Sequence, residues 1–207
     1  SDYKSDALEA KEKLDSVSPT MCLAKWNQTS LHLPTGLTNS CYHPPLHKID
    51  PTKLADNPAA LHNTAEKLEQ RSQMLKGERP EGCSYCWKLE DTGEMSDRQY
   101  RSGEPWAMQD FETIRQNPID ERWTPRYVEV NFNNACNLKC SYCSPQFSTA
   151  WGKETDTYGS YPTSTPHNAP EHFQGRRRPI PNREENPYVT AFWKWWPPKR
   201  SQTPHRR

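Results

Sequence analysis

The sequence predicts an α/β chain, in which a small cysteine-rich α+β module precedes a region that begins with one clear strand. Three observations support this. Leu, Ile, Val and Phe together make up only about 13% of the 207 residues, so aliphatic burial alone cannot build the core. The formal net charge is +1, which argues against a disordered, highly charged chain. The seven cysteines must therefore supply part of the organisation.

The cysteines also indicate the compartment. Seven is an odd number, so a complete set of internal disulfides is impossible. The N-terminal segment is charged and has no apolar core of a signal peptide, and no run approaches the roughly 20 apolar residues of a membrane span. We expect a cytoplasmic protein without a membrane partner, whose clustered cysteines bind metal. The near-zero net charge gives no sign of nucleic-acid binding, and we expect none.

The chain begins with two predicted parts. Residues 1–20 are rich in charged side chains and form a charged leader helix. Residues 21–90 form the cysteine-rich module. Apolar and polar residues alternate between Met21 and Ser40, and a turn signal that ends at Gly36 interrupts them, which predicts a β-hairpin.

A helix is the second element of this module. It runs from Asn63 to Lys76, with Asn63 or Thr64 as its N-cap and Gly77 just after its last turn. An apolar residue recurs every seven positions and predicts a thin buried seam, made of Leu61, Leu68 and Leu75.

Residues 91–126 form a helical linker before the next strand. Its helix covers residues 106–117 and ends at Pro118. The segment YVEVNF, residues 127–132, is short, alternating and rich in β-branched and aromatic residues, so it is the clearest strand in the chain. It opens the second region, residues 127–198.

The second region continues with a loop and one more helix. Pro, Gly, Ser and Thr dominate residues 156–187, which we expect to be a long loop. A helix follows, with Asn186 as its N-cap and Pro187 in its first turn. Its predicted apolar face consists of Val189, Phe192, Trp193 and Trp196. Residues 199–207 are a basic tail.

Three cysteines lie on the loop after the strand. Cys136, Cys140 and Cys143 have the spacing C-x3-C-x2-C. Three thiolates on so short a loop cannot surround a tetrahedral ion without a fourth ligand, but they can hold three corners of a cubane iron–sulfur cluster and leave its fourth iron open. An open iron is where a substrate or cofactor binds, so the pattern predicts an open metal cluster.

This pattern resembles the signature of the radical S-adenosylmethionine (radical SAM) superfamily, in which an aromatic residue precedes the last cysteine as Tyr142 does here. The resemblance implies a 4Fe–4S cluster on Cys136, Cys140 and Cys143, whose free iron chelates S-adenosylmethionine, with Tyr142 near the adenine. It implies an enzyme that cleaves S-adenosylmethionine to a 5′-deoxyadenosyl radical. It also makes residues 127–198 the first strand and helices of an incomplete (β/α) barrel.

The other four cysteines have a spacing of their own. Cys22 and Cys41 frame Gly36 as C-x13-G-x4-C, and Cys83 and Cys86 follow as C-x2-C. This order resembles the start of the twitch and SPASM modules, which bind auxiliary iron–sulfur clusters in radical SAM enzymes. The further cysteines of the full SPASM pattern are missing, so the resemblance implies a twitch-like module with one auxiliary 4Fe–4S cluster on four thiolates. These modules usually follow the barrel, whereas here the four cysteines precede it.

Zinc is the alternative at both places. The two C-x2-C pairs could form one zinc site, although this leaves Cys136 without a role. The four cysteines of the module could also form a zinc knuckle, in which the nearby His43 or His47 replaces a thiolate. The alternative function is then a non-enzymatic, zinc-stabilised interaction protein.

The resemblance also implies partners. Related auxiliary-cluster enzymes often modify peptides or proteins, so we expect a peptide or protein substrate and an electron donor of the flavodoxin or ferredoxin type. The family next supplies a Gly-Gly-Glu-Pro-like motif after a second barrel strand, and none follows Trp196. We therefore expect a fragment of a longer protein, or a truncated product with an unrelated tail, that is a doubtful catalyst by itself.

Overall fold

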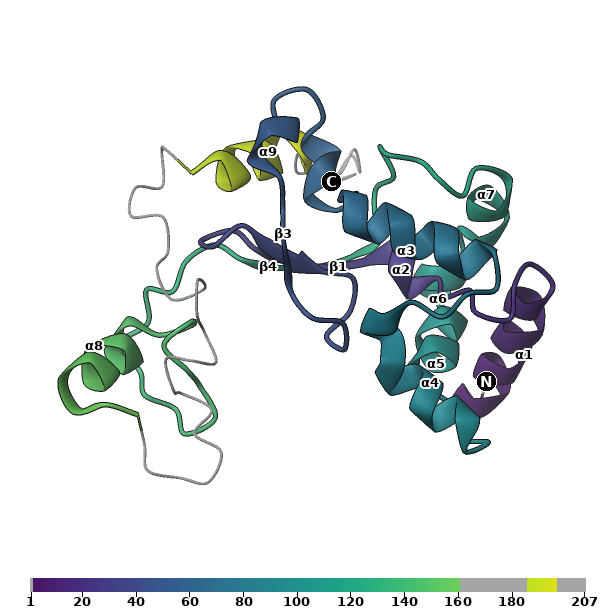
Figure 1. Ribbon diagram of the computed structural model, residues 1–207, viewed down its shortest axis with the longest axis horizontal. Coiled ribbons are helices and arrows are strands. Elements are labelled where there is room, and N and C mark those ends of the chain that lie inside the picture. The colour runs from purple at the N-terminus through teal and green to yellow at the C-terminus, as the bar shows by residue number, and fades with distance from the viewer. Residues whose placement is uncertain (1, 161–185, 197–207) are drawn as a thin grey trace, which may run out of the picture.

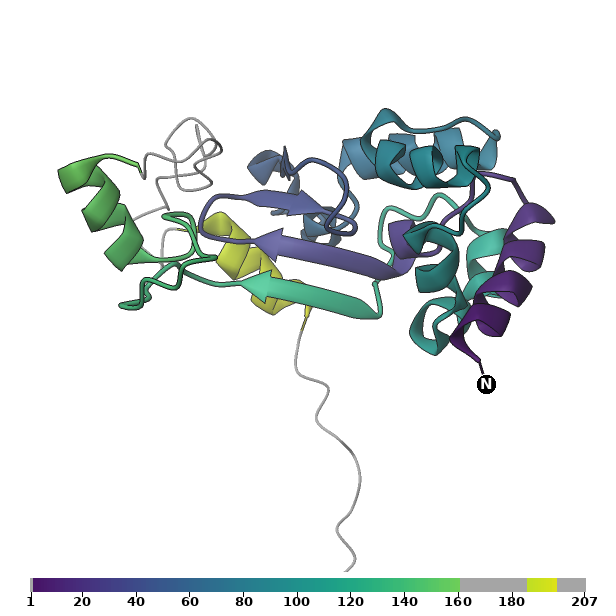
Figure 2. The same cartoon turned by 90° about the horizontal axis from the view of Figure 1, so that it is seen from below.

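A four-stranded mixed sheet lies at the centre of the part of the chain that the structure describes. The computed structural model describes residues 2–160 and 186–196 (Figure 1). Most helices gather beyond one end of the sheet, and helix α8 lies beyond the other end (Figures 1 and 2). The predicted α/β class is confirmed in this mixed arrangement.

The strand order of the sheet is β3-β2-β1-β4. β1 (Gln28–His32) pairs antiparallel with β2 (Leu37–Asn39), which pairs antiparallel with the two-residue β3 (His47–Lys48). This confirms the predicted hairpin, except that the residues just before it form a short helix, α2 (Ala24–Asn27).

β4 (Tyr127–Asn131) is the predicted strand, and it pairs with β1 in parallel (Figure 2). In this register Ser30 lies beside Glu129, and His32 lies beside Asn131. The two regions that the sequence divides at residue 127 thus share one sheet. No barrel closes within the described part of the chain, where β4 is an edge strand.

The sheet has one apolar and one polar face, because alternate residues of a strand point to opposite sides. Val128 and Val130 pack with Leu31 on the apolar face, under helix α9 (Pro187–Trp195) and the 3-10 helix η2 (Pro58–Leu61). The buried side chains of this core are Leu31, Leu33, Ile49, Leu54, Ala60, Leu61, Val189, Ala191 and Phe192. The alternate residues of β1 and β4 therefore give the opposite face its polar character.

The helix after Asn186 is confirmed as α9. The Asn186 side chain accepts hydrogen bonds from two backbone N–H groups of the first turn, at 2.9 and 3.3 Å. Val189 and Phe192 of the predicted apolar face are buried, whereas Trp193 is 50% exposed. The face is therefore narrower than the sequence predicts.

Gly36 lets α9 approach the hairpin. It has a φ of +66°, which favours glycine, and the ring of Tyr188 occupies the space that a side chain at position 36 would take. The glycine of the C-x13-G-x4-C pattern thus serves both the turn and the packing of a distant helix.

The predicted leader helix is α1 (Tyr3–Asp15), and it is docked on the protein. It lies along α5 (Asp97–Gly103), and its buried side chains are Ala7, Ala10 and Leu14 (Figure 1). Gly103 permits this contact, because a Cβ there would lie 3.0 Å from the backbone oxygen of Asp6.

The linker has more and shorter helices than the sequence predicts. The 3-10 helix η3 (Glu81–Cys83) runs into α4 (Ser84–Asp91), and α5 follows. The single helix predicted for residues 106–117 is wrong, since this segment forms α6 (Pro105–Met108) and α7 (Phe111–Gln116). The break lies at Asp110, the residue before α7, whose backbone is not helical. Its carboxylate accepts two hydrogen bonds of 2.7 Å from Arg126, which hold it in this position.

Helix α3 (Ala65–Leu75) is the helix predicted for residues 63–76, with Thr64 as its N-cap. Gly77 follows with a φ of +78°, as a helix-ending glycine does. Its buried face differs from the predicted leucine seam, because Leu68 and Leu75 are only partly buried. The buried side chains of the helix are Lys67, Arg71 and Met74.

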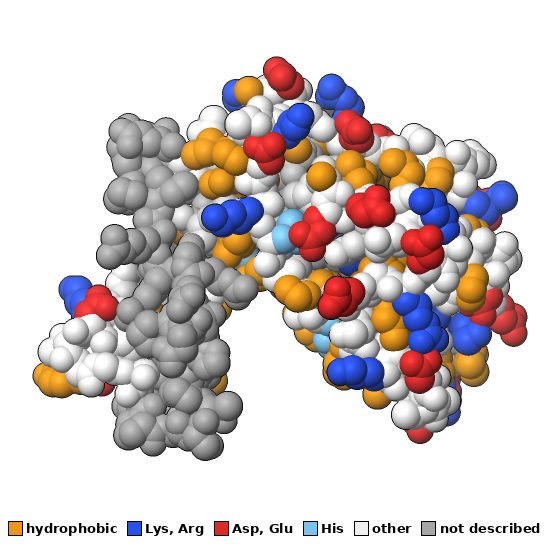
Figure 3. Space-filling view, in the orientation of Figure 1, with side chains coloured by type: hydrophobic (Ala, Val, Ile, Leu, Met, Phe, Trp, Pro, Cys, Tyr) orange, Lys and Arg blue, Asp and Glu red, His pale blue; other side chains and the backbone are white. Residues whose placement is uncertain are grey.

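Helix α8 (Thr149–Tyr158) extends into the segment predicted as a loop from residue 156. The remainder of that predicted loop, residues 161–185, and the basic tail, residues 199–207, lie outside the described residues. A further 3-10 turn, η1, covers Pro51–Lys53. None of the helices described reaches the length and apolarity that a lipid bilayer requires. On the face shown in Figure 3, acidic and basic side chains are interspersed.

Candidate metal centres

The hairpin topology brings four distant cysteines to one place. Cys22 lies just before α2 and β1, and the antiparallel return of β2 carries Cys41 back to the same end of the sheet. Cys83 ends η3 and Cys86 lies in the first turn of α4, which covers this end. All four side chains line one cavity, which we call the four-cysteine cavity. The four cysteines that the sequence groups thus lie together, and their role as metal ligands stays a prediction.

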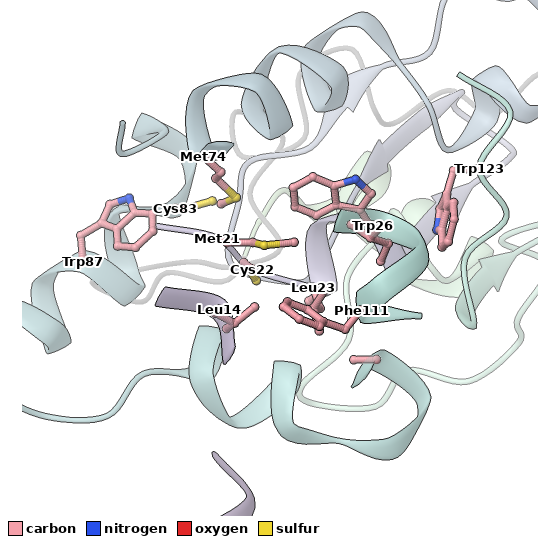
Figure 4. Packing of buried hydrophobic residues seen from close by; sticks show 13 residues of the cluster. Leu14, Met21, Cys22, Leu23, Trp26, Met74, Cys83, Trp87, Phe111 and Trp123 are labelled. Atoms are coloured by element: carbon pink, nitrogen blue, oxygen red, sulfur yellow. The ribbon is translucent and has the colours of Figure 1, made fainter. Parts of the chain in front are cut away.

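The cavity is embedded in the main apolar cluster of the helical region. Cys22 and Cys83 lie in this cluster with Met21 and Met74, and Trp87 and Trp26 flank them (Figure 4). Cys22, Cys83 and Cys86 are each less than 10% exposed. Such burial excludes water and makes any charge formed here costly unless it is compensated.

Burial governs the acidity of these thiols. It raises the pKa of Cys22 to about 12, with added repulsion from Cys41, Cys86 and Cys83. It also raises the pKa of Cys86 to about 11, and it raises the pKa of Cys41. This repulsion means that a negative charge on one of these sulfurs disfavours a negative charge on Cys22. Forming thiolates here would gather several negative charges in one buried cavity, which a cation would have to compensate.

Hydrogen-bond donors already point at two of these sulfurs. The backbone N–H of Arg98 lowers the pKa of Cys86 against the effect of burial, and the backbone N–H of His43 does the same for Cys41. The hydroxyl of Ser96 lies beside Cys86 but donates to a carboxylate oxygen of Glu90 at 2.6 Å. The hydroxyl of Ser40 lines the cavity too, is buried, and has no partner among the described residues. N–H and O–H groups aimed at sulfur stabilise thiolates and tune the potential of iron–sulfur clusters.

Cations surround the four-cysteine cavity. Lys25, Arg98 and Arg101 line it, and Lys25 lowers the pKa of both Cys22 and Cys41. Arg98 is 3% exposed and forms a forked ion pair with Glu90, with two N–O distances of 2.8 Å. Lys25 is 2% exposed and donates to the neutral side chain of Gln70 at 2.7 Å. Its charge therefore has no carboxylate beside it in the hydrogen bonds described.

Two more cations are buried behind the cavity on α3. Lys67 is fully buried and donates only to hydroxyls, those of Thr29 and Thr38, each at 2.9 Å. Burial, followed by repulsion from Arg71 and Lys25, lowers the pKa of Lys67 well below its usual value, whereas Cys41 raises it. Burial also lowers the pKa of Arg71 to about 9. This excess of buried positive charge matches an anionic group in the adjacent cavity.

The dimensions of the cavity limit what fits without movement. Its free volume is about 20 Å³, little more than the roughly 10–15 Å³ that one water molecule needs. Yet within residues 2–160 and 186–196, no three side chains of His, Cys, Asp or Glu are gathered closely enough to hold one ion. The four thiols are ligands of the kind that zinc and iron–sulfur clusters use. Their side chains would have to rotate before they could hold either one ion or a cubane.

The two histidines considered as replacement ligands have other partners. His43 Nε2 lies 2.7 Å from a carboxylate oxygen of Asp97, and its ring stacks on Tyr85 with centroids 3.8 Å apart. His47 Nε2 lies 2.8 Å from the hydroxyl of Thr64. Burial, followed by repulsion from Lys67 and Lys25, lowers the pKa of His47 to about 4. Only His43 lines the four-cysteine cavity.

The second group, the three-cysteine loop, follows β4 at the opposite end of the sheet. Helix α8 holds it: the hydroxyl of Ser148 donates to the carbonyl of Leu138 at 2.7 Å, and the indole N–H of Trp151 donates to the carbonyl of Cys140 at 3.0 Å. The backbone N–H of Cys143 donates to the carbonyl of Cys140 at 2.9 Å, which forms a turn. The described contacts therefore hold the loop through its backbone carbonyl groups rather than through its thiol groups.

The thiols of this loop are accessible. Cys136, Cys140 and Cys143 are all partly exposed, and Tyr142 is 86% exposed. A hydrogen bond between the Tyr142 hydroxyl and the Cys140 sulfur raises the pKa of Tyr142, and negative charge on Cys140 and Cys143 adds to this. Tyr142 therefore lies beside the cysteines, on the open side of the loop.

The sheet separates the two groups. The four-cysteine cavity adjoins the start of β1, and the three-cysteine loop continues from the end of the parallel strand β4 (Figure 2). A five-residue strand is about 17 Å long, which sets the scale of this separation. A single zinc site shared by the two C-x2-C pairs is therefore wrong, because their cysteines lie at opposite ends of the sheet.

Sequence reasoning missed the charged residues around the cavity. Lys67 and Arg71 are buried although their residue types are usually exposed. Their spacing, i and i+4 on one helix, was the available signal, since it places both on one face. Ser40 and Ser96 gave no signal, because their positions depend on contacts between distant segments.

Compared with known proteins, the chain matches no protein-family model, no curated protein and no solved structure.

Proposed function

We propose that the chain binds two iron–sulfur clusters and belongs to a radical SAM enzyme. Cys22, Cys41, Cys83 and Cys86 would hold a fully ligated auxiliary 4Fe–4S cluster. The loop formed by residues 136–143 would hold a 4Fe–4S cluster with one open iron. The proposal depends most on one observation, the convergence of four cysteines from distant segments on one buried cavity.

The charges around the four-cysteine cavity support an anionic group there. Four thiolates with their metal carry net negative charge in either a zinc site or an oxidised cubane. Lys25 and Lys67 are buried without a carboxylate among their described hydrogen bonds, so that charge would stabilise both. Asp120 already favours the charged form of Arg71. The backbone N–H of Arg98 would act directly on one of the ligand sulfurs, that of Cys86.

The exposure of the three-cysteine loop supports an open cluster. Three partly exposed thiols on one loop leave the outward side of a bound cluster accessible to a second molecule. When bound, the cluster supplies one electron that cleaves S-adenosylmethionine. The chain itself supplies the three thiolates, the rigid backbone turn, and Tyr142, whose exposed ring is free to stack on an adenine.

A zinc-stabilised interaction protein is the second candidate, and one observation favours it. The free volume of about 20 Å³ in the four-cysteine cavity is closer to the size of one ion than to that of a cubane. In that case the three-cysteine loop would have no catalytic role.

Anaerobic purification with iron and sulfide reconstitution tests the proposal. We expect a brown protein with about seven to eight irons per chain, since each cubane contains about four. Addition of S-adenosylmethionine to the dithionite-reduced protein should change the electron paramagnetic resonance signal of one cluster and leave the other unchanged.

A Cys140→Ala variant is the matched control for that experiment. It should lose about half of the iron together with the response to S-adenosylmethionine, and keep the signal of the auxiliary cluster. A colourless protein with one zinc per chain and no iron would establish the second candidate instead.

A further inference from the structure

A groove lies over the polar face of the sheet, between the two candidate metal centres. Its volume is about 600 Å³, within the range of roughly 300–1,000 Å³ that small-ligand sites occupy. Tyr42, His43 and Pro44 line both this groove and the four-cysteine cavity. At the other end it is bounded by Phe147, which lies four positions after Cys143 of the three-cysteine loop. We call it the sheet groove.

The floor of the sheet groove is made of alternate strand residues. Ser30 and His32 of β1 lie beside Glu129 and Asn131 of β4 in the parallel register, and Asn39 of β2 lies beside Ser30. The same strands turn Leu31, Val128 and Val130 to the core under α9. A small sheet that keeps one entire face polar and hollow, while its other face is packed, has a surface suited to a ligand.

Hydrogen-bond acceptors predominate on this floor. Each carboxylate oxygen of Glu129 accepts one hydroxyl, from Ser30 and from Tyr127, both at 3.0 Å, and each has a further lone pair available. The Oδ1 atom of Asn39 is buried and has no partner in the described part of the chain. A ligand that donates several hydrogen bonds would satisfy the free lone pairs of Glu129, and it would reach Asn39 Oδ1 once the Asn39 side chain turns toward the groove.

The charge of the groove is negative. Glu129 is the only Asp, Glu, Lys or Arg among the thirteen described residues that line it, and it forms no ion pair with a described residue. The apolar part of its lining includes Pro44, Pro45, Leu46 and Phe147. The groove thus offers an apolar channel that leads to one carboxylate.

We propose that the sheet groove binds an aliphatic amine, such as a lysine side chain presented by a peptide. The methylene stem would lie between Phe147 and the Pro44–Leu46 wall, and the ammonium group would donate to Glu129 and Asn39. Its role as the substrate of the radical chemistry rests on the proposed function, whereas its binding to the groove does not.

Fluorescence anisotropy with two labelled peptides tests this on the full, metal-reconstituted chain. One is an acetylated polyalanine peptide with a single lysine at its centre, and the other has norleucine there, which has the same stem without the amine. The lysine peptide should bind about fivefold more tightly, the effect of one exposed charge pair, and the difference should shrink at about 0.5 M salt.

Two variants assign that difference to the groove. Glu129→Gln should remove most of it while retaining an acceptor for Ser30, and Glu129→Lys should make the lysine peptide the weaker ligand. Glu112→Gln, on α7 and paired with Arg115 at 2.7 Å, should leave both affinities unchanged. Equal binding of the two peptides to the unaltered protein, or an undiminished difference in Glu129→Gln, would overturn the proposal.

The iron content of the same samples separates this proposal from the proposed function. A preparation that contains no iron but still distinguishes the two peptides contradicts the radical chemistry and supports the groove. A preparation with both clusters and a normal response to S-adenosylmethionine, but no preference for the lysine peptide, supports the radical chemistry and contradicts the proposal for the groove.

Discussion

The four-cysteine cavity and the three-cysteine loop contain the same residue type in opposite surroundings. In the cavity the thiols come from distant parts of the chain, lie in an apolar cluster and are surrounded by buried cations. In the loop they come from eight consecutive residues, are partly exposed, and are held through their backbone by α8. The cavity exists only when the chain is folded, whereas the loop needs little more than its own turn.

This difference would give a bound metal two uses. In the cavity, the free energy of metal binding would add to the free energy of folding, because the unfolded chain has no such site. In the loop, metal binding would contribute little to the fold and would leave the metal open to a second molecule. The variants below test this division between a structural and an open site.

The largest expected effect comes from removing one ligand of each group. Cys83→Ala should abolish metal binding at the cavity and lower the melting temperature by about 10 °C or more, since several kcal/mol are lost at about 2–4 °C each. Cys140→Ala should abolish metal binding at the loop and lower the melting temperature by less than about 2 °C. Differential scanning calorimetry measures the melting temperatures, and iron analysis measures metal binding. Equal decreases in melting temperature for the two variants would contradict the division into a structural and an open site.

The next effect concerns the cations near each group. Arg98→Met should cost about 3–5 kcal/mol, because it leaves the mostly buried carboxylate of Glu90 without its partner. Lys139→Met, on the three-cysteine loop, removes a half-exposed partner of Glu154 and should cost less than about 1 kcal/mol. Urea unfolding gives both free energies. A smaller cost for Arg98→Met than for Lys139→Met would show that the buried charges do not stabilise the cavity.

The smallest expected effect is a pH dependence of the unfolding free energy, which should arise in the part of the protein around the four-cysteine cavity and not in the three-cysteine loop. His62 is fully buried, its Nε2 lies 2.7 Å from the Trp26 carbonyl oxygen and 2.9 Å from a guanidinium nitrogen of Arg71, and burial lowers its pKa well below 6.5. Below pH 6.5 the unfolded chain thus binds a proton that the folded protein does not. Between about pH 7 and pH 5 the unfolding free energy should fall by about 2 kcal/mol from this residue.

His62→Gln is the control, because glutamine can donate to the same carbonyl and does not titrate. It should remove the contribution of His62 and leave one of similar size from His47, whose pKa is lowered to about 4, so about half of the combined dependence should remain. The loop and helix from residue 132 to 158 contain no histidine, so their own stability should not change in this range. An equally steep dependence in His62→Gln would exclude the buried imidazole as its source.

The elements with local signals could be predicted from the sequence. The hairpin, the strand β4, and the caps at Thr64 and Asn186 depend on neighbouring residues, and all agree with the structure. The split between α6 and α7 was missed because it depends on Arg126, which contacts Asp110 from the far side of a loop.

The candidate sites were predicted unequally. The spacing of Cys136, Cys140 and Cys143 identifies the loop directly, because the three thiols are local. The grouping of the other four relied on a resemblance, and their common cavity agrees with it. The charges behind the cavity could not be predicted, because burial of Lys67 depends on hydroxyls of two different strands.

The parallel pair of β1 and β4 has a consequence for synthesis. Ser30 and Glu129 meet across 99 positions, so β4 leaves the ribosome long after its neighbour. Such non-local pairing is slow to form, and until then β1 is an uncovered edge that invites aggregation. All four cavity cysteines emerge before β4 does, so early metal delivery to the nascent chain would protect it while β4 is still awaited.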